Sequence, residues 1–194
     1  MPPPRFTSGH LKENDVDFCY GSSDGQLWPI LDRIFDLNLR FETTAFAIQQ
    51  RKDFLRERKI GICDIVASAE RTKIDASDLG MQNIILRDLI GYLKNYPNVN
   101  TLLFTGGNSK NGPEYFFRKH LKEHQQKLHI VSNSVPRIHS FKLNDRIIKT
   151  VSLTAPSGAA NRAIGSMDTY KLLKSKNPKF NTIDFRVLQY AEFF

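Results

Sequence analysis

The chain has 194 residues, of which 40% are hydrophobic and 25% charged, values typical of a globular protein large enough to bury its own core. It contains no apolar run of membrane-spanning length, no secretory signal pattern, and too few cysteines (two) for a disulfide framework or a four-thiolate cluster. The net charge is +8, and residues 137–194 carry ten Lys and Arg against four Asp and Glu. These features predict one intracellular domain over residues 1–194 and a polyanionic partner such as nucleic acid.

The N-terminal part of the chain combines an irregular segment with an aromatic-rich turn. Residues 1–16 include three consecutive prolines and show no periodicity. Phe18, Tyr20 and Trp28 then surround a Gly-Ser-Ser-Asp-Gly turn, whose glycines let the backbone approach a ligand and whose neighbouring rings could stack on one. A surface loop that leads into a core helix is the alternative interpretation. Trp28 opens an apolar run at helical spacing, which predicts a helix.

The rest of the chain alternates between strand-like and helix-like apolar patterns. Helices are predicted over residues 43–58, 82–94, 163–174 and 183–194, and from residue 110 to about residue 125. Strands are predicted over residues 60–66, 101–105, 128–131, 141–143 and 147–153, and a loop over residues 68–80. This order predicts an α/β fold, a three-layer α/β/α sandwich with a mainly parallel sheet. Ligands bind such folds at the carboxyl ends of strands, where Asp64, Asn108 and Ser157 are expected.

A Gly-x-Ser-x-Gly pattern at residues 21–25 matches the nucleophile elbow of serine hydrolases, with Ser23 as the nucleophile. That elbow requires a strand directly before it and a helix directly after it. Residues 18–20 are the only candidate for the strand, and it would precede every other strand of the sheet. The pattern therefore favours a turn over a hydrolase site.

A His-x-x-Glu-His pattern at residues 120–124 matches an inverted zinc-protease motif. Both imidazoles would share one helix face. However, Phe116, Phe117 and Leu121 give this segment the pattern of an ordinary amphipathic helix with a solvated polar face, so no metal site is expected.

Residues 106–109, Gly-Gly-Asn-Ser, follow a predicted strand and could hold a phosphate at the start of the next helix. The segment lacks the lysine of a P-loop. We therefore expect Asn108 or Ser109 to cap that helix.

Three blocks carry a family resemblance. They are Phe-Cys-Tyr-Gly-Ser-Ser-Asp-Gly-Gln-Leu-Trp (18–28), Gly-Ile-Cys-Asp-Ile-Val-Ala-Ser-Ala-Glu-Arg (61–71) and Ala-Pro-Ser-Gly-Ala-Ala-Asn-Arg-Ala (155–163). In this order they resemble the uracil-DNA glycosylase superfamily, most closely its mismatch-specific uracil and hypoxanthine-DNA glycosylase branches. The resemblance covers about residues 17–175, and the third block is the most specific.

The resemblance implies a role for particular residues in each block. The first supplies the ring that stacks on a flipped base, Phe18 or Tyr20, and Asp64 in the second lines the base pocket. Gly21 and Asn108 complete the expected pocket. The third resembles a loop that enters the minor groove and pinches the backbone, with Pro156, Ser157, Gly158, Asn161 and Arg162 as its matching residues.

Two departures from the family pattern matter. The family's first motif begins with a central strand of the type apolar-Ile-x-Gly-Thr-x-Pro, which is expected to be missing here. Gly25 stands where related enzymes carry an asparagine. We therefore expect Asp24 to be the catalytic carboxylate, with a turn-forming role as the alternative and Asp64 as its replacement if Asp24 points outward. The lack of cysteine ligands separates the chain from the iron–sulfur branches.

The function implied is that of a monofunctional DNA glycosylase of base-excision repair. It would hydrolyse the N-glycosidic bond of a flipped uracil or hypoxanthine, with phosphates held by Arg162, Lys171 and Lys174. We expect no cofactor and no metal, a monomer, DNA with a damaged base (single- or double-stranded) as the partner, no membrane, and a cytoplasmic, nucleoid-associated location. The alternatives are a catalytically silent DNA-binding module of the same fold and a serine hydrolase that uses Ser23.

Overall fold

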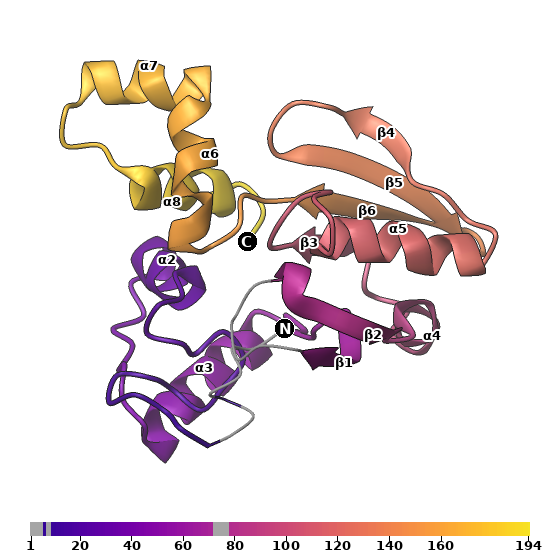
Figure 1. Ribbon diagram of the computed structural model, residues 1–194, viewed down its shortest axis with the longest axis horizontal. Helices are drawn as coiled ribbons and strands as arrows, with labels where there is room; N and C mark the ends of the chain where they lie inside the picture. Colours follow the sequence, from indigo (N-terminus) through magenta and orange to yellow (C-terminus); the bar gives the residue numbers. More distant parts are fainter. Residues whose placement is uncertain (1–5, 7–8, 72–77) are drawn as a thin grey trace. The chain divides into compact units, whose positions relative to one another are not determined.

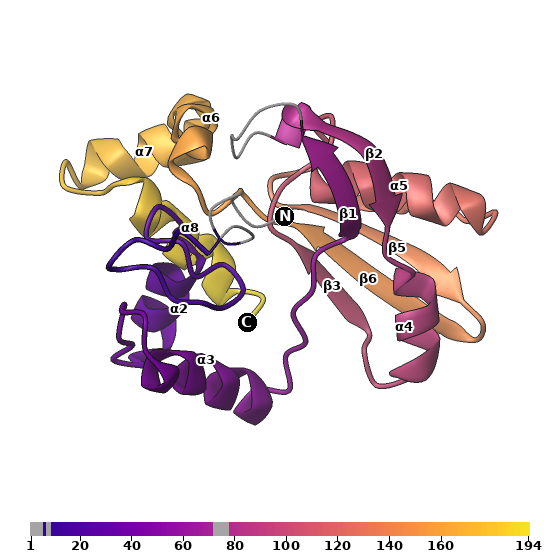
Figure 2. The same ribbon diagram turned by 60° about the horizontal axis from the view of Figure 1, so that its bottom comes forward.

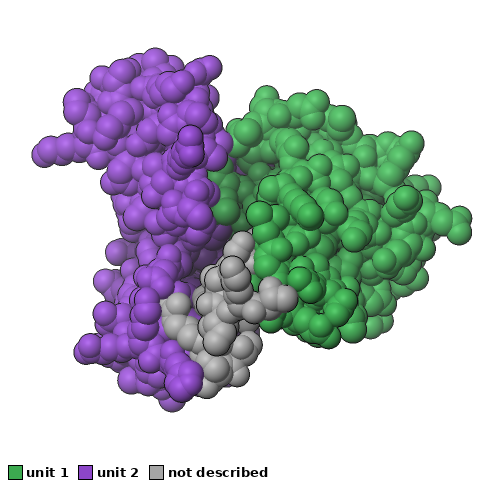
Figure 3. Space-filling view, in the orientation of Figure 1, with its two compact units in different colours: residues 1, 64–155 green, residues 2–63, 156–194 purple. Residues whose placement is uncertain are grey.

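The computed structural model describes residue 6, residues 9–71 and residues 78–194. These residues form two compact units, one made of residues 64–155 and the other of residues up to 63 together with residues 156–194 (Figure 3). We refer to them as the sheet unit and the helical unit. Parts of two expected features, the irregular N-terminal segment and the loop over residues 68–80, lie outside the described residues. The loop expectation is wrong for residues 68–71, which belong to a strand.

The sheet unit contains strands and helices, which alternate only from β2 to β4 (Figure 1). Its elements are β1 (Val66–Arg71), the 3₁₀ turn η1 (Asp78–Gly80), β2 (Met81–Leu86), α4 (Leu89–Asn95), β3 (Thr101–Phe104), α5 (Pro113–Glu123), β4 (His129–Ser132), β5 (Arg137–Leu143) and β6 (Arg146–Ser152). The chain is thus of mixed α/β type, as expected from the sequence.

The four-stranded sheet has the order β3-β6-β5-β4 and is of mixed orientation. Only β3 and β6 run parallel, whereas β6–β5 and β5–β4 are antiparallel. The expected mainly parallel sheet is therefore wrong for the described strands. The reason is local: the two-residue turn at Asn144, whose φ of 54° suits an asparagine, joins β5 directly to β6 and forces them antiparallel.

Helix α5 lies beside the four-stranded sheet, near β1 and β2 (Figure 2). Its side chains take part in two apolar clusters of the sheet unit. Phe117 and Leu121 pack with α4 and with the sheet residues Phe141 and Ile148. Phe116 instead packs against Val66 and Met81 of the antiparallel β1–β2 pair. Apolar side chains on two sides of α5 therefore hold the four-stranded sheet and the β1–β2 pair to the same helix.

The helical unit consists of helices and loops, apart from one isolated β-bridge between its described residues. Its elements are α2 (Leu27–Phe35), α3 (Ala45–Glu57), the 3₁₀ turn η2 (Gly158–Ala160), α6 (Asn161–Ser166), α7 (Asp168–Lys176) and α8 (Thr182–Ala191). Trp28 is 1% exposed and packs edge-on against Phe54 of α3, while Ile164, Phe180 and Phe185 form a second cluster under α7.

Three sequence expectations for secondary structure are wrong. The strand expected over residues 60–66 begins only at Val66 and continues to Arg71, because the pairing of Glu70 with Gln82 selects that register. The helix expected over residues 82–94 is split into β2 and α4, since the same pairing draws its first half into a sheet. The helix expected over residues 163–174 is interrupted at Met167, which is extended (ψ 132°).

Candidate functional site

The aromatic-rich turn is held from inside by Asp15, a fully buried carboxylate. Its two oxygens accept hydrogen bonds from the backbone N–H of Ser23 (2.7 Å) and of Lys12 (2.9 Å). A carboxylate that accepts backbone N–H groups fixes a loop much as a capping residue fixes a helix end. The sequence analysis did not identify Asp15, because nothing in its neighbourhood distinguishes it from a solvated aspartate.

Gly21 lies at the tightest point of this turn. Its N–H donates to Phe18 O and its carbonyl accepts from Val16 N–H. A Cβ atom at this position would lie 1.9 Å from the Val16 carbonyl oxygen, so no larger residue fits without a backbone shift. The close approach is made to the chain itself, which gives Gly21 a structural role beside its expected place in the base pocket.

The three aromatic residues of the turn differ in exposure. Trp28 is core, and its Nε1–H donates to the Cys19 carbonyl at 2.7 Å. Phe18 is half-buried, with its ring centroid 6.0 Å from that of Trp28. Tyr20 is 36% exposed and has a φ of 58°. Of the two candidates for base stacking, Tyr20 thus presents the more accessible ring.

The second loop of the helical unit, residues 156–160 before α6, is hydrogen-bonded to this turn. The backbone N–H of Gln26 donates to the carbonyl of the buried Pro156 at 2.9 Å, and Gly25 forms an isolated antiparallel bridge with Ser157. Two of the three blocks that carry the family resemblance are therefore adjacent in space, although they are far apart in the sequence.

Arg186 of α8 anchors this second loop from below. The side chain is fully buried, with NH2 donating to Ser157 O (2.8 Å) and NH1 donating to Asn161 Oδ1 (2.9 Å). Burial disfavours the charged form of each group, so it lowers the pKa of Arg186 and raises the pKa of its fully buried neighbour Tyr190. Asn161, expected at the DNA surface, thus uses its side-chain oxygen for the internal architecture of the loop.

Asp24 has a cationic partner that the sequence did not indicate. Its Oδ2 lies 2.9 Å from Lys12 Nζ, and both side chains are more than half exposed. Its backbone N–H donates to Ser22 Oγ at 3.2 Å, a contact in which Ser22, two residues earlier, supplies the turn-forming side chain. The side chain is accessible to a ligand, and its charge is already paired.

The three cations expected at phosphates have different surroundings. Arg162 is exposed in the first turn of α6. Lys171 is exposed and lies 3.3 Å from Asp168, one turn earlier on α7. Lys174 donates to the carbonyls of Pro178 and Phe180, each at 2.8 Å, and so ties the end of α7 to the loop that follows.

Asp64 and Asn108 lie in the sheet unit. Asp64 is half-buried, and its backbone carbonyl accepts from Arg87 Nε at 2.9 Å. Asn108 is exposed in the loop after β3. The expectation that Asn108 or Ser109 caps the next helix is wrong, because α5 begins at Pro113 with Gly112 as its N-cap. Residues 106–109 fold back against the start of α5, where the Gly112 N–H donates to the Ser109 carbonyl at 2.8 Å, but none of them is the N-cap.

The sheet unit also holds a buried carboxylate, Glu114, that the sequence analysis missed. It accepts from Arg118 Nε (2.8 Å), Arg137 NH2 (2.7 Å) and Ser152 Oγ (2.6 Å). Burial alone would raise the pKa of Glu114, but the hydrogen bonds from Ser152 and Arg118 and the charges of Arg137 and Arg118 outweigh it and lower the pKa. Arg118 also meets Nε2 of the buried His139, whose pKa is lowered chiefly by burial. This network is internal and fixes α5 to the sheet.

The serine-hydrolase geometry is not formed around Ser23. Residues 9–24 contain no strand, and the helix after the pattern begins at Leu27. Ser23 itself is exposed in a turn. A nucleophile elbow needs the strand and the helix on either side of the serine to aim its hydroxyl.

A half-open hollow of about 350 Å³ lies on the sheet unit, lined by Ile84, Ile85, Leu86, Phe116, Lys119 and Glu123. None of the residues expected to act on DNA lines it. Among the described residues, no helix combines the length and the apolar character needed to cross a membrane.

Comparisons with known proteins give no match: no protein-family model, no curated protein and no solved structure is similar to this chain at a significant level.

Proposed function

We propose that this chain is a DNA glycosylase that hydrolyses the N-glycosidic bond of a flipped, deaminated base, uracil or hypoxanthine. One observation carries the proposal: the turn before α2 and the loop before α6 are joined by the Gln26–Pro156 hydrogen bond and the Gly25–Ser157 bridge. The resemblance gives these two segments the contacts to the base and to the DNA backbone. An enzyme that extrudes a base must hold the base and its own sugar-phosphate side by side.

We place the hydrolysis of the glycosidic bond at the exposed face of the turn before α2, where this turn joins the loop before α6. The extruded base stacks on Tyr20, whose ring is the more accessible of the two candidates, with Phe18 behind it. Departure of the base leaves an oxocarbenium-like sugar, which water attacks at the same carbon while the base takes up a proton. Asp24 is the carboxylate that stabilises this cation. Its pairing with Lys12 is solvent-exposed and therefore weak, so the positive sugar can replace the ammonium group.

The proposal has requirements beyond the junction. It calls for a single functional domain with a three-layer α/β/α arrangement, and for Gly158 and Arg162 to lie against the DNA backbone. It also places the protein in the cytoplasm at the nucleoid, as a monomer without a cofactor.

The direct test is base release from duplexes that contain a single uracil or hypoxanthine, read as strand cleavage after alkali. The parent protein should release the base. Asp24→Asn should lower the rate by two orders of magnitude or more at nearly unchanged DNA affinity, because the carboxylate acts on transition-state charge. Asp17→Asn, a change of the same kind at an exposed position in the same turn, should retain the parent rate.

The outcomes of this test distinguish a glycosylase that uses Asp24 from one that uses Asp64 and from a catalytically silent DNA-binding module. Equal rates for Asp24→Asn and the parent would remove Asp24 from the mechanism and direct attention to Asp64. Binding without release from any substrate would leave a catalytically silent DNA-binding module, a reading favoured by the existing charge partner of Asp24. No binding and no release would reject both.

The proposed binding of DNA phosphates is tested separately, by the salt dependence of the affinity. If the basic side chains of the helical unit contact phosphates, the logarithm of the affinity should fall linearly with the logarithm of the salt concentration, by about 0.9 per contact. Arg162→Ala and Lys171→Ala should each flatten this slope by about one unit on damaged and undamaged duplexes alike, because phosphates carry no base information. Lys52→Ala, an exposed lysine on α3, serves as the control. An unchanged slope in both variants would assign these cations to solubility alone.

A further inference from the structure

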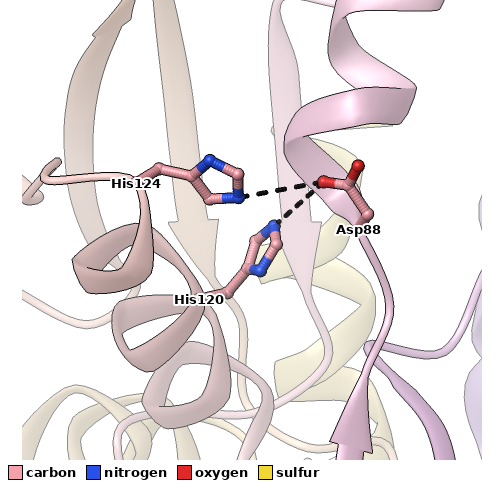
Figure 4. A group of neighbouring side chains, drawn as sticks. All are labelled: Asp88, His120 and His124. Atoms are coloured by element: carbon pink, nitrogen blue, oxygen red, sulfur yellow. Dashed lines mark ion pairs between the residues drawn. The ribbon is translucent and has the colours of Figure 1, made fainter.

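Three potential metal ligands of the sheet unit converge where α5 ends and α4 begins (Figure 4). Asp88 is the N-cap of α4, and His120 and His124 lie one helical turn apart on α5 and at its C-cap. The Oδ1 atom of Asp88 lies 3.6 Å from His120 Nε2 and 3.9 Å from His124 Nε2. One ligand atom from each of the three residues lies within 4.8 Å of the others.

We propose that Asp88, His120 and His124 form a zinc site. In a tetrahedral zinc site with bonds of about 2.0–2.2 Å, neighbouring ligand atoms are about 3.4 Å apart. The two distances to Asp88 exceed this value by about 0.2 and 0.5 Å. The ligand atoms of the two imidazoles lie within 4.8 Å of each other, so metal binding would also draw the two rings together. Two imidazoles and one carboxylate suit zinc, whereas magnesium and calcium prefer oxygen ligands alone.

The surroundings of His120 favour the tautomer that a metal requires. Its Nε2 accepts the backbone N–H of Ile90 at 3.3 Å, so this nitrogen carries a lone pair and the proton resides on Nδ1. The Nδ1 atom faces Glu123 Oε2 at 3.8 Å, the carboxylate–histidine–metal arrangement that orients ligating imidazoles. The Ile90 bond is long, and zinc would replace it at Nε2.

The three side chains differ in exposure in a way that suits metal uptake. His120 is 4% exposed, so the expected solvated polar face is wrong for this histidine, and packing holds its ring in place. The side chains of His124 and Asp88 are 37% and 66% exposed and give access from solvent. Three protein ligands leave a fourth position for water. Bound zinc would tie the start of α4 to the end of α5.

The test is a metal titration of the full, untagged chain. Because the thiols of Cys19 and Cys63 are exposed and would themselves bind zinc, the titration uses a Cys19→Ser/Cys63→Ser background, stripped with chelator. Cobalt(II), a spectroscopic substitute for zinc, should give visible absorption that saturates at one equivalent and disappears when zinc is added. Zinc should also raise the midpoint of thermal unfolding.

Two exposed ligands give the decisive variants. Asp88→Asn keeps the helix cap, since asparagine caps as well as aspartate, and His124→Gln keeps the size of a polar side chain. Each should weaken cobalt and zinc binding by about 100-fold or more, given that even outer partners of a metal site cost about 10–100-fold. His129→Gln, at an exposed histidine of β4, should bind as the parent does. No saturable binding in the parent at micromolar metal, or parent-like affinity in either ligand variant, overturns the proposal.

Discussion

At residue 21 the chain leaves no room for a side chain. The carbonyl oxygens of Val16 and Phe18 would lie 1.9 and 2.9 Å from a Cβ atom. Both belong to backbone that the Asp15 carboxylate and the Val16–Gly21 hydrogen bond hold in place, so neither can yield cheaply. The sequence predicts a glycine that lets the backbone approach a ligand, yet the closest group to this glycine is its own chain.

Gly21→Ala should therefore destabilise the protein by about 2 kcal/mol or more, measured as the shift in the midpoint of urea unfolding. Gly165→Ala is the matched control in the same unit: it lies in α6, and apart from its chain neighbours and the backbone of its own helix no described atom lies within 4 Å of its Cβ position. Alanine is the better helix former by up to about 1 kcal/mol, so this variant should be as stable as the parent or more so. If Gly21→Ala has the same free energy of unfolding as Gly165→Ala, the clash at residue 21 is relieved without cost.

At the scale of elements, α8 fixes the loop that precedes α6. Arg186 reaches from α8 to the Ser157 carbonyl and the Asn161 side chain, and its NH1 also meets Thr182 O on its own helix at 3.2 Å. The loop that we propose to contact DNA thus has its shape set by a guanidinium group beneath it. Loops that bind ligands are commonly positioned by a rigid scaffold in this way.

Arg186→Met should cost about 3 kcal/mol of unfolding free energy, because it leaves buried oxygens on Ser157 and Asn161 without their charged donor. Arg33→Met, which breaks the Arg33–Asp184 ion pair of α2 with α8, should cost less than about 1 kcal/mol, since Arg33 is half exposed. Denaturant unfolding of both variants checks the difference. If Arg186→Met unfolds at the same midpoint as Arg33→Met, the buried hydrogen bonds do not hold the loop.

Elements with a strong local pattern could be predicted from the sequence, and those selected by pairing could not. The helix expected over residues 43–58 is α3, and the turn around Asn144 joins the expected hairpin strands. In contrast, residues 82–94 have apolar positions at helical spacing, yet the β1–β2 pairing draws residues 81–86 into a strand. Tertiary pairing outweighs a local preference of this size.

In the candidate site too, the residues with a local sequence signature could be predicted and those defined by distant partners could not. The turn with Tyr20 and the Pro-Ser-Gly loop could be found from residue types alone, because turns and loops have local signatures. The groups that hold them, Asp15 and Arg186, could not, since their partners lie elsewhere in the chain. One signal for Arg186 was available: it shares a helix face with Gln189 and Tyr190, and a charged residue on a buried stripe needs internal partners.

At the scale of the whole molecule, the two units bury different kinds of charge. The described core of the helical unit holds the guanidinium groups of Arg51 and Arg186, which stay protonated at any ordinary pH, together with the carboxylate of Asp15; burial lowers the pKa of Arg51 only to about 10. The sheet unit holds groups that titrate in acid, namely His120, His139 and Glu114. The buried histidines of the described residues thus lie in the sheet unit, and mild acid should act there first.

Burial is the largest cause of the lowered pKa of both His120 and His139, and the charge of His124 also lowers that of His120. In the unfolded chain both histidines titrate near 6.5. As the pH falls below that value, the histidines of the unfolded chain become protonated while those of the folded protein stay neutral. The free energy of unfolding therefore decreases, by up to about 1.4 kcal/mol per pH unit for each histidine. Above about pH 7 this contribution is complete and flat.

Unfolding in urea, in the presence of chelator, should thus show a constant midpoint from about pH 8 to pH 7 and a falling one towards pH 5. Glu114 adds a second loss below its unfolded value of 4.5, because its folded pKa is also lowered and its carboxylate must be protonated against Arg118 and Arg137. His139→Gln should reduce the slope between pH 7 and pH 5, while His129→Gln, at an exposed position, should leave it unchanged. A midpoint independent of pH from about 8 to 5 would mean that these histidines are protonated as readily in the folded protein as in the unfolded chain.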